Sequence, residues 1–139
     1  MQAFIKKISL LSLIAFSLLL ISCGDDFKES GIEGRWQLQK KQTADGTIVQ
    51  VDTVFYSFKK NVFEYLKLTS PTEYYHIFGN YSTEGQSVSI SIAEDSAEPK
   101  DCQVCFDWDT LQRSFLIKDH TSSRLELESG GTVYFFRKY

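Results

Sequence analysis

The chain has 139 residues, which is enough for one domain and too few for two. Its formal net charge of −3 at pH 7 argues against nucleic-acid binding, which needs a clustered basic surface. An aromatic content of 14% with only 2 prolines excludes a disordered or low-complexity chain.

The N-terminal segment has the pattern of a signal peptide. Residues 1–7 are short and basic, and residues 8–21 are almost wholly apolar. An apolar run of about 14 residues is too short to span a bilayer comfortably and matches the hydrophobic region of a secretory signal. We therefore expect residues 1–22 to be removed. The loss of Lys6 and Lys7 then makes the remaining chain more acidic.

The run Leu20-Ile21-Ser22-Cys23 resembles the lipobox of bacterial lipoproteins. A small residue at Ser22 suits the signal peptidase, and the thiol of Cys23 can accept a diacylglyceryl group. We predict that Cys23 is the lipidation site and that the membrane is a partner through this anchor, since two or three acyl chains hold far more firmly than one. The alternative is an ordinary secretory signal with a coincidental cysteine.

The residues after Cys23 bear on the destination. Gly24 stands where the inner-membrane retention signal has an aspartate, which favours the outer membrane. The pair Asp25-Asp26 resembles the acidic run that sends some lipoproteins to the cell surface, so a periplasmic and a surface-facing location both stay open. Residues 23–30 are polar, and we expect a lipidated, flexible tether.

Residues 31–139 have the pattern of one all-β domain. Trp36 and Leu38 alternate with polar neighbours, and Val88, Ile90 and Ile92 alternate with serines, which is typical of half-buried strands. Similar patterns and the turns between them predict eight antiparallel strands, at 34–41, 48–58, 62–69, 73–81, 88–93, 115–118, 124–128 and 132–139. Short strands at near-regular spacing indicate a sandwich or a barrel.

The long connection 94–112 breaks this regularity and could hold a short helical turn or a cap across a barrel mouth. It contains Cys102-Gln103-Val104-Cys105. These two cysteines could form a local disulfide in an oxidising compartment, stay as free thiols, or serve a thiol oxidoreductase, because this spacing lowers a thiol pKa. The acidic neighbours and the missing βαβ pattern argue against the redox function.

Several short motifs resemble those of a known family. Gly34-Arg35-Trp36 resembles the Gly-x-Trp motif of lipocalins, and Gly79-x-Tyr81 followed by VSISI is similar to the middle of lipocalin-like domains. Residues 115–139 look like the close of such domains in small Gram-negative lipoproteins. The resemblance implies an up-and-down barrel of about eight strands with one closed end and one open mouth. It also implies that Gly34, Trp36 and Arg137 close the barrel, with Arg137 against the Trp36 ring.

The aromatic residues suggest binding, although core packing explains them as well. The residues that could line a ligand mouth are Tyr56, Phe58, Tyr65, Tyr74, Phe78, Trp108 and Phe115. An eight-stranded barrel has room either for filled packing or for one small ligand. A mouth blocked by Phe106 and Trp108 would favour the filled barrel.

No catalytic constellation appears. The chain has no Gly-x-Ser-x-Gly elbow and no glycine-rich phosphate loop, and its two histidines, His76 and His120, belong to separate elements. We therefore expect no enzymatic activity, no cofactor and no metal. Three residues, Thr53, Ser96 and Thr110, match the Asp-[Ser/Thr]-apolar pattern of an O-glycosylation acceptor.

Three hypotheses for the function follow. The first is a lipid-anchored, non-enzymatic envelope lipoprotein whose lipocalin-like barrel binds a small hydrophobic ligand. The second is a filled barrel that acts as a protein-interaction module or as an accessory subunit of an envelope complex. The third is a thiol oxidoreductase at Cys102 and Cys105.

Overall fold

A computed structural model describes residues 31–95 and 108–139. The predicted signal peptide (1–22), the tether with Cys23 (23–30), and Ser96, Cys102, Cys105 and Phe106 lie outside the described residues. The predictions for them therefore stay predictions.

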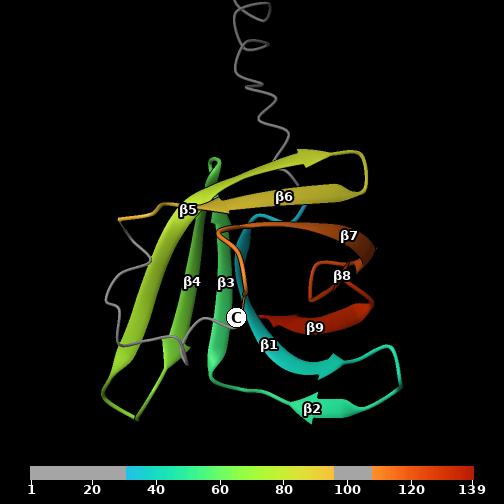
Figure 1. The fold of residues 1–139 in the computed structure, drawn as a ribbon, viewed down its shortest axis with the longest axis horizontal. Coiled ribbons are helices and arrows are strands. Elements are labelled where there is room, and N and C mark those ends of the chain that lie inside the picture. Colours follow the sequence, from blue (N-terminus) through green and yellow to red (C-terminus); the bar gives the residue numbers. More distant parts are fainter. Residues whose placement is uncertain (1–30, 96–107) are drawn as a thin grey trace, which may run out of the picture.

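The described residues form one antiparallel sheet that closes into a barrel (Figure 1). Its strands are β1 (Gly34–Gln42), β2 (Ile48–Gln50), β3 (Val54–Lys59), β4 (Val62–Leu68), β5 (Tyr74–Glu84), β6 (Ser87–Ile92), β7 (Gln112–His120), β8 (Arg124–Ser129) and β9 (Thr132–Lys138). Each of the eight strands β1 and β3–β9 pairs with the next, and β9 returns to β1. The predicted all-β barrel is confirmed, and these ranges contain no helix.

The strand predicted at 48–58 is two strands, because the chain changes direction between them. β2 pairs with the last residues of β1 (Lys40–Gln42), whereas β3 pairs with the first ones (Gly34–Gln37). At the break, the Gln37 side chain donates a hydrogen bond of 2.7 Å to the carbonyl oxygen of Asp52. The short β2 is therefore an addition beside the barrel, which periodicity alone could not separate from β3.

The turn between β1 and β2 is held by Asp45, as the Asp-Gly pair predicts. The Asp45 carboxylate accepts hydrogen bonds from the Thr43 hydroxyl and from the Thr47 backbone N–H, the latter at 3.0 Å. Gly46 has φ of +88°, which a side chain would disfavour.

These hydrogen bonds, that of the Thr43 side chain above all, lower the pKa of Asp45 from 3.8 to about 2. Because the folded-state pKa is the lower one, the ionised carboxylate stabilises the turn above pH 3.8, and this contribution is lost as the pH falls through about 2. Thr43→Val should raise the pKa from about 2 toward 3.8 in an NMR titration of Asp45, because it removes the largest of the hydrogen bonds that lower this pKa. An unchanged pKa would contradict the hydrogen-bonded turn.

One end of the barrel is closed around Trp36, which is 1% exposed. Its indole N–H donates a 2.8 Å hydrogen bond to the Ile32 carbonyl, and the Lys138 ammonium lies 4.3 Å from the centre of the ring. Gly34 makes this possible, since a Cβ there would lie 2.0 Å from Lys138 Nζ. Because position 34 has no side chain, the Lys138 side chain can pass over the backbone of β1 and reach the Trp36 ring.

The cation over Trp36 is therefore Lys138, and the expectation of Arg137 is wrong. Trp36 lies opposite Lys138 in the β1–β9 register, and Gln37 lies opposite Arg137. Arg137 consequently turns to the other face of the sheet, where its Nε donates a 2.8 Å hydrogen bond to the Gln37 side chain. This contact still ties the first strand to the last.

Candidate functional site

The seven aromatic residues predicted to line a ligand mouth fall into two groups. Those that are buried inside the barrel are Tyr56, Phe58, Tyr65, Trp108 and Phe115. Tyr74 and Phe78 are instead 61% and 45% exposed, because the inward positions of β5 belong to Ile77, Gly79 and Tyr81. Tyr74 and Phe78 therefore lie on the outer wall and not in the barrel interior, and a ligand-lining role for them stays a prediction.

The buried group packs against itself around Tyr56. The centre of the Tyr56 ring lies 4.8 to 6.4 Å from the centres of neighbouring rings, which are those of Phe63, Tyr65, Trp108, Phe115 and Phe136. Trp108 also stacks on Phe63 at 5.9 Å and donates a 3.2 Å hydrogen bond to the Tyr56 hydroxyl. These rings occupy the space that an interior ligand would need.

Arg113 of β7 completes this packing. Its guanidinium carbon lies 5.6 Å from the ring centres of Trp108 and Phe115 and 5.7 Å from that of Tyr134, so three ring faces attract the cation. Its Nε donates a 3.3 Å hydrogen bond to the Ser129 hydroxyl. Its Nη1 is buried with no hydrogen-bond partner in the described part of the chain. The guanidinium of Arg113 is thus held by three ring contacts and one hydrogen bond.

A hollow of about 740 Å³ lies on the outer wall of the barrel, where β1, β3, β4 and β5 run side by side. Its lining comprises Glu33, Gly34, Arg35, Ser57, Phe58, Lys59, Lys60, Val62, Glu64 and Phe78. This volume is within the range of small-molecule sites, roughly 300–1,000 Å³. Phe58 and Phe78, two of the predicted ligand-lining residues, border this outer hollow.

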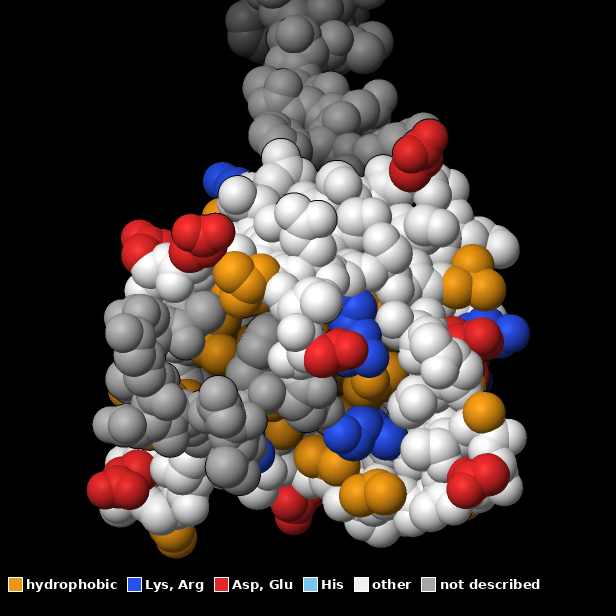
Figure 2. Space-filling view, viewed as in Figure 1, with side chains coloured by type: hydrophobic (Ala, Val, Ile, Leu, Met, Phe, Trp, Pro, Cys, Tyr) orange, Lys and Arg blue, Asp and Glu red, His pale blue; other side chains and the backbone are white. Residues whose placement is uncertain are grey.

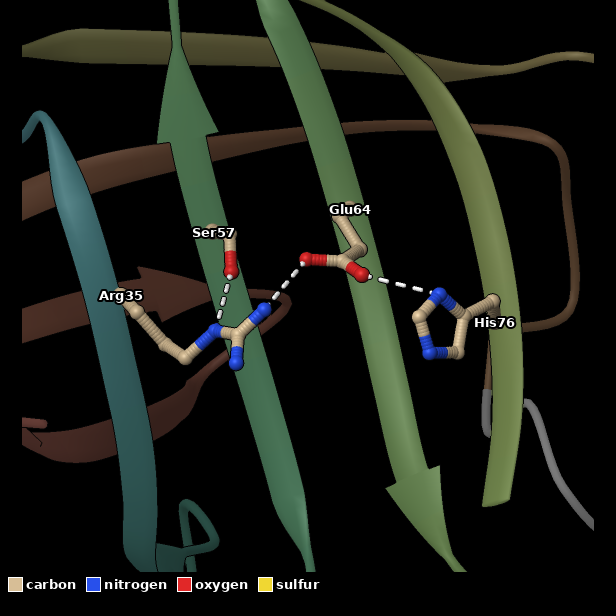
Figure 3. A network of polar contacts seen from close by, with 4 residues as sticks. All are labelled: Arg35, Ser57, Glu64 and His76. Carbon is tan, nitrogen blue, oxygen red and sulfur yellow. Dashed lines mark hydrogen bonds and ion pairs between the residues drawn. The ribbon is translucent and has the colours of Figure 1, made fainter.

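A polar network forms one side of the hollow (Figure 3). Arg35, Ser57 and Glu64 face each other across three strands, because the register pairs Arg35 with Ser57 and Ser57 with Glu64. Arg35 donates to the Ser57 hydroxyl at 3.2 Å and to Glu64 at 3.1 Å, while His76 Nδ1 lies 2.9 Å from the other Glu64 oxygen. The Ser57 hydroxyl is thus hydrogen-bonded to Arg35, and His76 contacts the Glu64 carboxylate. The serine and the histidine do not contact each other as a nucleophile and its base would.

Apolar side chains are exposed beside this network. Val62 and Phe78 are 48% and 45% exposed and border the hollow, and Phe78 continues a row of rings along β5. The His76 ring lies 4.7 Å from Tyr74 and 5.6 Å from Phe78. Figure 2 shows another face of the molecule, since the strands run in the opposite order in Figure 3; on that face hydrophobic side chains gather near the middle beside Lys and Arg side chains, and no histidine is visible. In the sequence, Tyr74, His76 and Phe78 stand at every second position, and this spacing predicts that their three rings lie on one face of β5.

The remaining predicted site residues lie apart. His120 packs edge-on against Trp36 at 5.9 Å, far along the sheet from the His76–Glu64 pair. Residues 31–95 and 108–139 contain no cluster of three potential metal ligands.

Two of the predicted O-glycosylation acceptors lie in the described residues. Thr53 precedes β3, and the exposed Thr110 donates a 2.6 Å hydrogen bond from its hydroxyl to the Gln112 carbonyl. The part of the chain that the structure describes has no helix that could cross a membrane.

Comparison with known proteins gives a consistent result. A family model described as a lipocalin-like domain matches residues 18–139. The chain is similar to a lipocalin-like protein from Bacteroides uniformis, with 38% identity and a TM-score of 0.72 over 78% of this chain and 99% of that one. It is also similar to an uncharacterized protein from Bacteroides eggerthii, with 29% identity and a TM-score of 0.68 over 77% and 98%. No curated protein matches the chain significantly.

Proposed function

This chain belongs to the lipocalin-like domain family, and we propose that it is a non-enzymatic binding protein of the cell envelope. In this proposal a lipid on Cys23 anchors the domain at the outer membrane, and the domain holds a small, largely hydrophobic ligand in the hollow on its outer wall.

The location of the hollow, on the outer wall of the barrel, supports the proposal. Among the described residues, the rings around Tyr56 pack against one another inside the barrel, whereas the 740 Å³ hollow lies outside, between Gly34 at the start of β1 and Phe78 on β5. This favours an outer site over a chamber inside the barrel.

The lining of the hollow indicates the chemistry of the ligand. Val62 and Phe78, which are exposed, supply apolar contact, and Lys59 and Lys60 also line the hollow. An apolar floor with a few charged groups fixes one end of a ligand and buries its body. The best fit is an amphipathic molecule with an anionic end.

A second candidate is a protein-interaction module, which the exposed β2 favours. Within residues 31–95 and 108–139, β2 pairs with no strand except β1, and its Ile48 and Val49 are 50% and 47% exposed. An open strand edge with apolar side chains can pair with a strand of a partner protein.

Cys23→Ser should leave the fold intact and release the protein from the membrane. The serine hydroxyl cannot form the thioether that carries the acyl chains, and without them no anchor remains. The measurement is fractionation of cells into membrane and soluble parts, followed by urea unfolding of both forms. If the serine variant still sediments with membranes, lipid anchoring at Cys23 is wrong.

A soluble form that begins at Gly24 should carry its ligand through purification. Its native mass should fall on extraction with organic solvent, and the extract identifies the ligand class. Phe78→Asp should abolish the extra mass because it places a charge on the apolar floor, and Tyr74→Asp is the matched control on the same strand face outside the hollow. A bare polypeptide mass, unchanged when fatty acids are offered, would instead favour the interaction module.

A further inference from the structure

The hollow lies at the end of the barrel where the tether joins. Glu33 and Gly34, which follow the tether after two residues, line the hollow directly. The β3–β4 turn reaches the same end, because Gly34 pairs with Phe58 and the Lys60 N–H donates a 3.1 Å hydrogen bond to Glu33. Figure 1 shows the start of β1 and this turn together toward the top of the view.

The tether keeps this end close to whatever holds Cys23. Residues 23–30 can span at most about 29 Å when fully extended. β1 alone, with its 9 residues, carries the chain about 30 Å farther to the opposite end of the barrel. If Cys23 is acylated, the hollow therefore lies nearer the bilayer than the β1–β2 turn does.

The surface at the tether end combines exposed apolar and basic side chains. Val62 and Phe78 are about half exposed, and the neighbouring Lys59 and Lys60 are exposed to solvent as well. Neither lysine has an ion-pair partner in the described part of the chain, whereas Arg35 is bound to Glu64. Basic side chains beside apolar ones suit the boundary between lipid headgroups and acyl chains.

The opposite end of the barrel carries exposed acids in its connections. These are Asp45 in the β1–β2 turn, Asp52 before β3, Glu73 before β5 and Asp109 before β7. An anionic bilayer attracts the lysines at the tether end and repels these carboxylates, so charge and tether favour one and the same orientation.

We propose that the hollow faces the membrane that holds the anchor and that its occupant is an anionic phospholipid of that leaflet. The acyl chain lies against Val62 and Phe78, and the phosphate contacts Lys59 and Lys60. The barrel then stands with its tether end on the bilayer and its acidic end away from it. This inference rests on the proposed lipid anchor at Cys23 and names the ligand of the proposed site.

The test uses the lipidated protein in vesicles of phosphatidylcholine, with and without phosphatidylglycerol, whose acyl chains carry bromine. Val62→Trp places a reporter at the hollow, and Ile48→Trp is the matched control, equally exposed on β2 at the other end. Trp36 and Trp108 contribute the same background to both variants. We expect a blue shift and loss of emission for Val62→Trp alone, strongest with phosphatidylglycerol. Lys59→Gln with Lys60→Gln should restore the emission, as should salt near 1 M, where screening acts within about 3 Å.

Each other outcome counts against a distinct part of the proposal. Equal emission from both reporters in sedimented vesicles would overturn the orientation while leaving the anchor intact. If the emission of Val62→Trp falls equally in vesicles without phosphatidylglycerol, the occupant does not need an anionic headgroup, and that part of the proposal is wrong. If the protein does not sediment with the vesicles, the anchor itself fails, and this inference falls with it.

Discussion

Replacing Trp36 with alanine is expected to lower the free energy of unfolding by about 3–5 kcal/mol. The side chain is 1% exposed, its N–H satisfies the buried Ile32 carbonyl, and its ring face receives the Lys138 ammonium. Alanine leaves a cavity at the closed end, removes the hydrogen-bond donor and leaves Lys138 without its ring.

Urea unfolding of the soluble form that begins at Gly24 measures this loss. Tyr74→Ala removes a comparably large ring from the outer wall, where it is 61% exposed, and should change stability by no more than about 0.5 kcal/mol. Trp36→Phe keeps most of the ring but not the N–H, and should cost about 1–3 kcal/mol. A loss below about 1 kcal/mol for Trp36→Ala would mean that this tryptophan does not close the barrel.

The alternation of side chains in the sequence was enough to predict eight barrel strands, because a period of two does not depend on the partner strand, although it merged β2 with β3. The incorrect prediction of Arg137 as the cation over Trp36 shows what alternation cannot predict. Adjacent residues of a strand point to opposite faces, so choosing between Arg137 and Lys138 requires the register of β9 against β1. A long-range pairing sets that register, and the family motif supplied an arginine where this chain uses the next residue.

The outer hollow was beyond sequence analysis for a related reason. Its walls come from β1, β3, β4 and β5, and its polar side exists because Arg35, Ser57 and Glu64 share one cross-strand row. Each strand alone reads as a half-buried strand with polar residues on its outer side. The sequence analysis did not predict that Phe78 faces outward, although Phe78 lies two residues from His76, which faces the same way.

Gly79→Ala is expected to cost at least about 3 kcal/mol, at the upper end of the range for overpacking. Gly79 lies in β5 opposite Ile92 of β6, and a Cβ there would lie 2.1 Å from the Ser91 carbonyl oxygen and 2.8 Å from the Ile92 Cα. These are backbone atoms, which cannot move away by changing rotamer, so the two strands must separate at this point.

Gly85→Ala, in the turn that joins the same two strands, separates steric crowding from backbone strain. A Cβ at Gly85 meets no atom within 4 Å, and only its φ of +58° opposes the change, which should cost about 1–2 kcal/mol. Both variants are compared by urea unfolding of the same soluble form. If Gly79→Ala costs no more than Gly85→Ala, the close approach of β5 and β6 at Gly79 does not exclude a side chain there.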